Sequence, residues 1–198
     1  MLTAQWLGRC AVRRGELELL TLGKPLAVLA YLDGQRHRSA SRTAIAQLLW
    51  SDVQMSDGRQ SLRQALYYIK GKLGIEIVES TAEQLVLSTD LESDRSDFEQ
   101  AVQSRHWAAA FSHYKGDFLS GFAAPGASEF EQWVSVERRR LSQMFLGVAE
   151  AHCRELMAQG HARDATAVAM RARDELRDEQ ASWRLLFESL LNARDLIL

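Results

Sequence analysis

The clearest pattern of polar and apolar positions lies between Asp57 and Gly74. Apolar residues recur there at i, i+4, i+7 and i+11, which predicts an amphipathic helix with one buried stripe: Leu62, Leu66, Ile69 and Leu73. Ser56 or Asp57 can cap the first free N–H groups of this helix, and Gly74 ends it. We therefore expect a helix whose opposite face, rich in arginine and glutamine, is open to solvent.

The residues before this helix predict strands and two shorter helices. Short runs at 3–12 and 16–21, punctuated by glycine, predict two or three antiparallel strands. The run KPLAVLAYL (24–32) has a helical repeat with Pro25 in its first turn, and Ser41 can cap a second helix over 42–50. A polar link (35–41) and a loop (51–56) join the three helices. The second and third helices are thus expected to form a helix-turn-helix, with the third as the reader.

A β-hairpin is expected after the third helix. Apolar residues alternate with polar ones around a turn-like segment at 80–82: Ile75, Ile77, Leu85 and Leu87. Strands, three helices and a hairpin predict an α+β winged helix-turn-helix domain over residues 1–90. The tip of this wing carries Glu79 and Glu83, which oppose contact with phosphates, so we expect the wing to add little affinity.

The second half of the chain has helical patterns. The polar, acidic stretch 90–97 lacks apolar periodicity and is the expected domain boundary. Beyond it we expect an all-α domain over 91–198, with a long helix from 128 or 129 to about 159 and two more at 162–176 and 179–193. Leu156 and Leu190 lie 34 residues apart, which is the tetratricopeptide period, so this domain is expected to be tetratricopeptide-like.

The last predicted helix has more apolar residues than one face can hold. A stripe at i, i+4, i+7 and i+8 is expected to pack on helix 162–176: Trp183, Phe187, Leu190 and Leu191. Further apolar residues lie outside that stripe: Leu185, Leu186, Leu196, Ile197 and Leu198. Because the final unit of a helical stack needs a polar outer face, this surplus predicts either self-association or a following helix.

Composition and charge narrow the choice of function. The chain has 198 residues, 46% of them hydrophobic, which is enough to build a core. Its net charge of −2 argues against a nucleic-acid binder, yet residues 35–72 hold seven Lys or Arg against two Asp, a local charge of +5. Two distant cysteines, no export signal and no run of about 18 apolar residues predict a cytoplasmic protein without membrane contact.

The outer face of helix 57–73 has the residue types that read DNA. Arginine fits two acceptors on guanine, glutamine pairs with adenine, and tyrosine reaches phosphates or stacks. Taken alone, such a face more often contacts only water, so the flanking sequence must decide between the two interpretations.

Five segments carry a resemblance to a known family. They are KPLAVLAYL (24–32), SRTAIAQLLW (41–50), SLRQALYYIKGKLG (61–74), YKGDFLSGF (114–122) and SEFEQWVSVERRRL (128–141). The chain resembles regulators of the Streptomyces antibiotic regulatory protein type, which join a winged-helix (OmpR-type) DNA-binding domain to a bacterial transcriptional activator domain of tetratricopeptide-like helices. Its second domain stops at Leu198, before the usual helical array, so a fragment or a shortened member is expected.

The resemblance implies an activator that binds double-stranded DNA at promoter repeats, as a homodimer or in tandem, and recruits RNA polymerase without a cofactor. It places these residues in the major groove: Arg59, Gln60, Arg63, Gln64 and Tyr67. It places these near phosphates: His37, Arg38, Ser41, Arg42, Lys70 and Lys72. Within the loop 51–56, the polymerase contacts would be Asp52, Val53, Gln54 and Met55. The acidic wing, the Tyr67-Tyr68 pair and Gly71 depart from more basic choices in the family.

Besides DNA-binding activation, two other functions have to be compared with the sequence. A protein-interaction module, with the acidic helical half binding partners and the winged helix as a scaffold, fits the wing glutamates but not the +5 cluster. An enzyme is not expected, because the phosphate-loop, dinucleotide, zinc-protease, serine-hydrolase and paired-cysteine motifs are all missing. A metal at His152 and Cys153, or a second nucleic-acid patch at 138–140, is less favoured than ordinary helix positions and a solvated, salt-bridged face.

Overall fold

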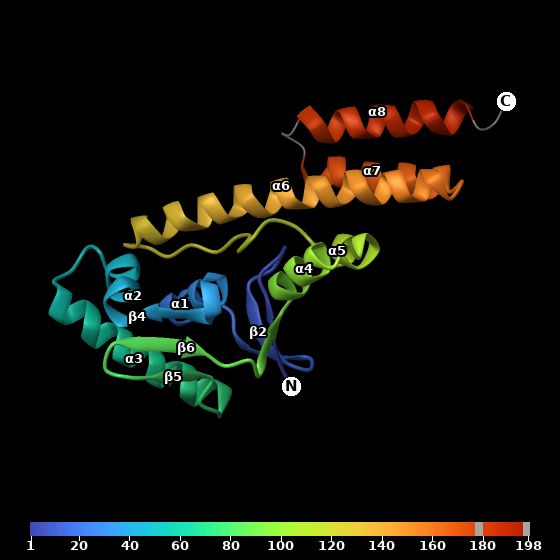
Figure 1. Cartoon of the computed structure of the whole chain (residues 1–198). Helices are drawn as coiled ribbons and strands as arrows, with labels where there is room; N and C mark the ends of the chain where they lie inside the picture. Colours follow the sequence, from blue (N-terminus) through green and yellow to red (C-terminus); the bar gives the residue numbers. More distant parts are fainter. Residues whose placement is uncertain (177–179, 196–198) are drawn as a thin grey trace. The chain divides into compact units, whose positions relative to one another are not determined.

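The chain forms two compact units, and residues 118–137 return to the first one. The computed structural model describes residues 1–176 and 180–195, with the side chains of the last helix described as far as Leu191. The first unit comprises Met1–Ser96 and Phe118–Glu137, and the second comprises Asp97–Asp117 and Arg138–Leu198. All described strands lie in the first unit, and the second is helical, so a small sheet region precedes a largely helical one along the chain (Figure 1).

A four-stranded sheet opens the first unit. Its strands are β1 (Leu2–Gln5), β2 (Ala11–Arg14), β3 (Leu17–Leu20) and β7 (Leu91–Ser93), in the order β3-β2-β1-β7. The first three are antiparallel, as predicted, whereas β7 pairs in parallel with β1. Strand β7 lies in the stretch that lacks apolar periodicity and was expected to be the domain boundary. It has only two inward positions, Leu91 and Ser93, and such a short alternation leaves no visible periodicity.

Three helices build the core of the first unit: α1 (Lys24–Gly34), α2 (Arg42–Leu49) and α3 (Met55–Leu73). The Ser41 hydroxyl accepts the Ala44 N–H at 3.1 Å and caps α2, as predicted. The predicted start of α3 was wrong, because the helix begins at Met55 and its N-cap residue, Gln54, makes no side-chain cap bond. Gly74 ends α3 in the left-handed conformation, with φ of 68°.

A three-stranded sheet contains the predicted hairpin. Strands β5 (Val78–Ser80) and β6 (Gln84–Leu87) pair antiparallel, and β4 (Ser39–Ser41) adds to the other edge of β6. The hairpin is shorter than predicted, since Ile75 is exposed and precedes β5. Strand β4 follows the short 3₁₀ turn Arg36–Arg38 within the segment expected to be a polar link. Its sequence, SAS, gives no strand signal, so pairing with β6 determines its conformation.

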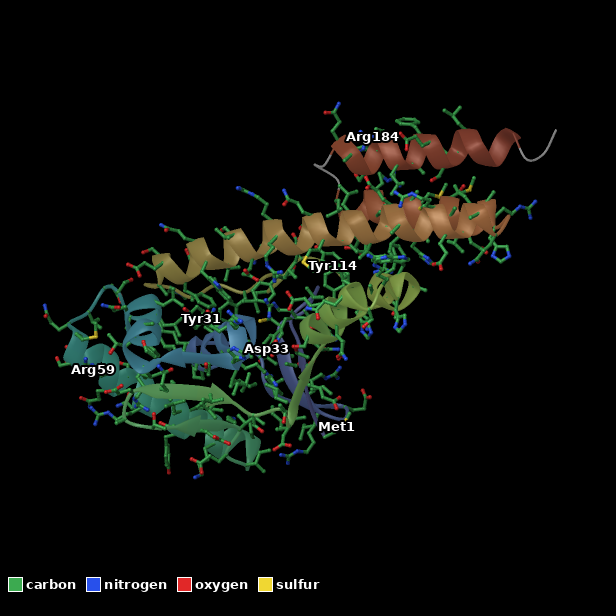
Figure 2. All side chains as sticks on the ribbon, viewed as in Figure 1. Met1, Tyr31, Asp33, Arg59, Tyr114 and Arg184 are labelled. Atoms are coloured by element: carbon green, nitrogen blue, oxygen red, sulfur yellow. The ribbon has the colours of Figure 1, made fainter. Side chains whose placement is uncertain are left out.

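A buried polar cluster ties α1 to both ends of β7 in the first unit. The Asp33 carboxylate is 3% exposed and accepts hydrogen bonds from Trp6 Nε1 (2.9 Å), Ser93 Oγ (2.7 Å) and Arg38 Nη2 (2.8 Å). Figure 2 shows Asp33 within this unit. Asp94 accepts the backbone N–H groups of Trp6 and Leu7. Burial raises the pKa of the Asp94 carboxyl to about 7, although those two N–H donors act to lower it.

The second unit is built from helical segments. They are α4 (Asp94–Gln103), α5 (Trp107–His113), α6 (Ser128–Ala158), α7 (Ala162–Glu175) and α8 (Gln180–Asp195), of which α4 and α6 begin in the first unit. The long helix α6 starts and ends within about one residue of its predicted bounds. The rings of Tyr114 and Phe145 stack at 4.2 Å, and the Arg171 guanidinium lies 4.4 Å above the Phe111 ring.

The packing of α8 is the reverse of the predicted one. The stripe expected to face α7 is exposed: Trp183 (39%), Phe187 (60%), Leu190 (42%) and Leu191 (64%). The buried stripe is spaced i, i+3, i+4 and i+7 and consists of Ser182, Leu185, Leu186 and Ser189. Small serine side chains let α8 approach its neighbour closely, and Ser182 Oγ donates to the Leu176 carbonyl at 2.9 Å. Residues Glu179, Leu196, Ile197 and Leu198, which also figured in the prediction, lie outside the described residues.

Candidate nucleic-acid interface

Helix α3 has one buried face and one fully exposed face. The buried face holds Gly58, Leu62, Ala65, Ile69 and Leu73, which matches the predicted stripe except that Leu66 is only half-buried. The predicted major-groove residues are all exposed on the other side: Arg59, Gln60, Arg63, Gln64 and Tyr67. Tyr67 is 82% exposed, an unusual position for an aromatic ring. The sequence-predicted set therefore forms one continuous surface of α3.

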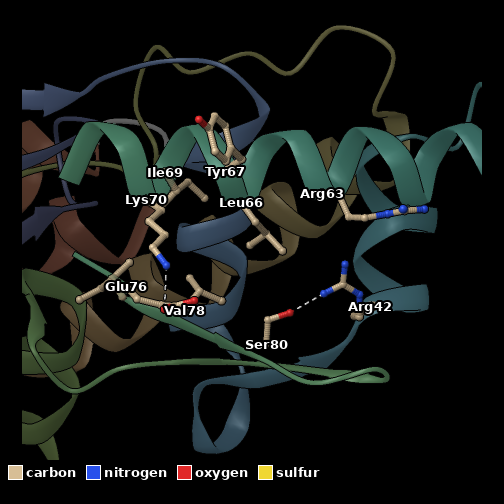
Figure 3. Close-up of a pocket in the computed structure, with 10 residues that line it drawn as sticks. Arg42, Arg63, Leu66, Tyr67, Ile69, Lys70, Glu76, Val78 and Ser80 are labelled. Atoms are coloured by element: carbon tan, nitrogen blue, oxygen red, sulfur yellow. Dashed lines mark hydrogen bonds and ion pairs between the residues drawn. The ribbon is translucent and has the colours of Figure 1, made fainter. Parts of the chain in front are cut away.

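A hollow of about 210 Å³ separates α3 from the hairpin. Figure 3 shows Arg42 and Lys70 at its two ends, with Arg42 Nη1 donating to Ser80 Oγ (2.5 Å) and Lys70 Nζ paired with Glu76 Oε2 (2.9 Å). Both members of the Lys70–Glu76 pair are more than half exposed, so the pair is weak. The floor of the hollow is apolar: Leu66, Ile69, Ile77 and Val78. Cationic groups thus flank a shallow apolar floor between helix and hairpin.

A second hollow, of about 450 Å³, lies between the start of α2, the start of α3 and the tip of the hairpin. Arg42 and Arg63 line both hollows, and Arg59 joins them in this one. Helix α2 begins here, so its first N–H groups and the positive end of its dipole lie close to three arginines. The backbone N–H of Arg42 donates to the Glu83 carbonyl at 2.8 Å, which fixes the start of α2 to the hairpin.

The predicted phosphate-contact residues fall into three groups. The first group consists of Arg42 and Lys70, which line the hollows, and Lys72, which lies on the outer face of α3. The Lys72 ammonium is 5.5 Å from the Tyr68 ring centre. Ser41 is engaged as the cap of α2, while His37 is exposed with a left-handed φ of 57°. The Arg38 guanidinium points inward, where it donates to Asp33, to the Ser88 carbonyl (2.9 Å) and to the Leu91 carbonyl (2.9 Å). We leave Arg38 out of the candidate interface for this reason.

The loop between α2 and α3 presents a separate pocket of about 350 Å³. Its lining includes Trp50, Val53, Met55 and Glu129, and Val53 is 44% exposed. Asp52 and Gln54 are exposed in the same loop. Asp52 lies against Gly126, where an added Cβ would come within 2.5 Å of its Oδ2. Of the predicted polymerase-contact residues, only Met55 is half-buried.

The second half of the chain matches a known protein family. Residues 80–193, more than half of the chain, match the family described as the bacterial transcriptional activator domain. The chain belongs to this family. This match confirms the activator-domain part of the resemblance seen in the sequence. Members of this family are generally not enzymes.

A solved structure supports the same fold for this activator-domain protein. It is Mycobacterium tuberculosis EmbR in complex with low affinity phosphopeptide, with a TM-score of 0.69, 20% sequence identity and coverage of 98% of this chain and 55% of that chain. The chain therefore spans about half the length of EmbR. No curated protein matches the sequence. Within the residues that the structure describes, no helix combines the length and apolar character needed to cross a membrane.

Sequence reasoning missed some residues of the interface in this activator-family member. Thr43, Ser80 and Gln84 line the hollows beside the arginines, but each is a lone polar residue on a strand or at a helix start. The pairing of β4 with β6 brings Gln84 next to Ser41, and the β5–β6 hairpin carries Ser80. The hairpin that carries Ser80 and Gln84 was predicted, but the pairing of β4 with β6, which holds it against the start of α2, was not.

Proposed function

We propose that this protein binds duplex DNA in a sequence-specific manner through a winged-helix domain and activates transcription from the bound site. The observation that supports the proposal best is the exposed face of α3, where two glutamines, two arginines and the 82% exposed Tyr67 lie beside hollows lined by cationic groups. An α-helix fits the major groove of B-DNA, and a bare polar face on a helix that is otherwise well packed suits that role.

Each residue type on α3 has a definite part in the proposed complex. Arg59 and Arg63 present guanidinium groups that can bond guanine O6 and N7, and Gln60 and Gln64 present amides that can pair with adenine. Tyr67 would reach the backbone or stack against a base. These residues carry the sequence information, so their removal should change preference as well as affinity.

Other residues would hold the DNA backbone. Arg42 lies where a phosphate could meet its guanidinium beside the positive end of the α2 dipole. Lys70 and Lys72 would contact phosphates along the last turns of α3, and exposed His37 would lie nearby. Glu79 and Glu83, both exposed on the hairpin, would limit how closely the wing approaches the backbone.

The loop between α2 and α3 would contact RNA polymerase. Exposed Val53 and half-buried Met55 line an open pocket whose rim includes Glu129, and neither residue is needed for contact with DNA in the proposed pose. The winged-helix domain would end near residue 90, and the tetratricopeptide-like activator domain would follow it over 91–198.

A binding experiment tests the proposed DNA contact. Sequences selected from random duplex DNA by the full chain should share a motif, and Arg63→Ala should weaken binding to it by about 1–3 kcal/mol and relax the preference at one position. Arg139→Ala, which removes an exposed arginine from the second unit, is the matched control and should change nothing. Retention of wild-type affinity and preference by the Arg63 variant would overturn the assignment, and salt-independent duplex binding would favour an interaction module instead.

A second experiment separates activation from binding. Replacing both Val53 and Met55 with serine should lower transcription by purified polymerase while leaving operator affinity unchanged. Ile75→Ser, at a 41% exposed position after α3, serves as the control for loss of an exposed apolar residue. Equal loss of binding and transcription in the loop variant would assign the loop a folding role.

A further inference from the structure

The outer face of α8 is an apolar surface that the proposed DNA-binding function does not use. Its four residues, Trp183, Phe187, Leu190 and Leu191, follow one side of the helix at i, i+4, i+7 and i+8. From α7, Met170 (44% exposed) adds to the apolar surface of this helix pair, and the Arg173 guanidinium lies 5.1 Å from the Trp183 ring centre. We call the four apolar residues of α8 the α8 patch. Large contiguous apolar patches on soluble proteins mark interaction sites.

Two opposite charges flank the α8 patch on the same side. Arg184 follows Trp183, and Glu188 follows Phe187, so a helical turn of about 100° per residue places both charges on one shoulder of the stripe. They are 68% and 62% exposed, and their closest approach to each other is 3.7 Å. Figure 2 shows Arg184 on α8. Arg184 Nη2 also lies 3.9 Å from Glu150 Oε1 on α6, but exposed ion pairs of this kind are weak, so Arg184 and Glu188 both keep most of their surface open to a second charge.

We propose that the α8 patch binds the α8 patch of a second copy of this chain, with the two helices antiparallel about a twofold axis near Phe187. In an antiparallel helix pair, equal shoulders of the two helices face each other. Arg184 then lies beside Glu188 of the second copy, and Glu188 lies beside Arg184 of the second copy. The pattern is self-complementary, as an isologous interface requires.

The register follows from the spacing of the apolar residues. With the axis level with residue 186, Arg184 lies level with Glu188 of the second copy, the two Phe187 side chains pack next to each other across the axis, and Trp183 lies closest to Leu190 of the second copy. In a parallel pair, the side of one helix that carries Arg184 and Glu188 would face the other side of the second helix. Neither charge lies on that other side. An unrelated apolar helix would cover the apolar stripe but would leave Arg184 and Glu188 without opposite charges. The charge pattern therefore favours a second copy of this chain.

The oligomeric state in the absence of DNA tests this interface. Sedimentation of the purified full chain over a dilution series should show a monomer–dimer equilibrium, and Phe187→Gln or Leu191→Gln should weaken it at least about tenfold, since each removes apolar surface from the centre of the interface. Val136→Gln is the matched control, because Val136 on α6 is 64% exposed, as is Leu191. A strict monomer at high micromolar concentration would overturn the proposal and leave the patch to another protein, as would a dimer insensitive to both substitutions.

Mixing two charge variants tests the antiparallel pairing directly. Arg184→Glu places two acidic residues on each shoulder, and Glu188→Arg places two basic ones, so each variant alone should dimerise more weakly than the wild type. An equimolar mixture should form heterodimers more tightly than either homodimer, because every cross-pair is then attractive. Equal homodimer and heterodimer stabilities would rule out the proposed register.

Folding is checked in the same samples. The substituted side chains are all at least 60% exposed, so circular dichroism and the melting temperature should match those of the wild type. A variant that loses both helicity and dimerisation is replaced by the milder Leu191→Ala, for which a dimer of wild-type strength would count against the proposal. Since no DNA is present, a negative result leaves the proposed DNA binding intact.

Discussion

Helices α3 and α8 both bury one face in their own unit and expose a second face, but the exposed faces differ in chemistry. On α3 the second face is polar and cationic, and on α8 it is apolar with one acidic and one basic neighbour. A cationic face gains free energy from a polyanion by releasing counterions, whereas an apolar face gains it by leaving water. The two helices should therefore respond in opposite ways to the same perturbations.

The two proposed contacts lie on different helices. Loss of charge on α3 should affect DNA binding without affecting self-association, and loss of apolar surface on α8 should do the reverse. A residue whose replacement affects both would show that the two faces are coupled.

The largest expected effect comes from the buried face of α3. Leu62 is fully buried, so Leu62→Ala should lower the free energy of unfolding by about 2–5 kcal/mol through lost burial and a residual cavity. On α8, Leu186→Ala should also be clearly destabilising, because Leu186 is 7% exposed, whereas Leu191→Ala should change stability by no more than about 0.5 kcal/mol. Denaturant unfolding at a concentration where the chain is monomeric measures all three. Comparable losses for Leu186 and Leu191 would contradict the observed orientation of α8.

The next largest effect should come from the salt concentration, which should weaken DNA binding through α3 more than dimerisation through α8. If Arg42, Lys70 and Lys72 each neutralise one phosphate, raising the salt concentration fourfold should weaken duplex binding by about fortyfold. Dimerisation through the α8 patch should change much less over the same range, because apolar contacts dominate it. Fluorescence anisotropy with labelled duplex and sedimentation without DNA provide the two measurements. A dimer as salt-sensitive as the DNA complex would mean that charge, not apolar area, drives it.

A single lysine gives a finer test of the cationic face. Lys72→Ala should weaken binding to all sequences alike and lower the slope of log affinity against log salt by about 1. Arg63→Ala should instead alter the preferred sequence. If the Lys72 variant changed the preferred sequence, this residue would have to reach base edges.

The smallest expected effect concerns the tip of the hairpin. Glu79→Gln with Glu83→Gln removes two exposed negative charges and should strengthen non-specific duplex binding severalfold, with no change in the dimer. Competition with random-sequence DNA measures the change. Unchanged or weaker binding would mean that the tip stays away from the phosphates.

The same two helices show what the sequence could predict. The α3 stripe alternates with polar residues, so only one face could be buried. Its core residues were predicted correctly except for the half-buried Leu66, and the residues expected to face solvent are exposed. Their role in reading DNA stays a prediction. Helix α8 has two apolar stripes, and the buried one contains Ser182 and Ser189, which a hydrophobic pattern does not select. Helix spacing alone cannot rank two stripes when close helix packing, rather than hydrophobicity, decides between them.

Long-range pairing accounts for most of the remaining differences. Strands β4 and β7 are three residues each and form only because β6 and β1 offer free edges to them. Arg38 looked like a surface cation in the sequence, but Asp33 and two carbonyls bring its guanidinium inward. The major-groove and loop residues were placed by local pattern and resemblance, while the hollows beside α3 depend on how the hairpin packs against α3 and the start of α2.

The carboxyl group of Asp94, held by the N–H groups of Trp6 and Leu7, links folding to proton uptake. Its ordinary pKa of 3.8 rises to about 7 in the folded chain, so between these values the folded state binds a proton that the unfolded state lacks. Because a group with a raised acid pKa favours folding below that pKa, its contribution to the free energy of unfolding falls as pH rises from about 4 to 7 and is level above that range. Near pH 5.5 folding should take up about one proton at this site. The free energy of unfolding should be measured against pH for the wild type and for Asp94→Asn, and the difference between the two curves gives the contribution of this proton. Identical curves would mean that the Asp94 carboxyl keeps its ordinary pKa in the folded chain.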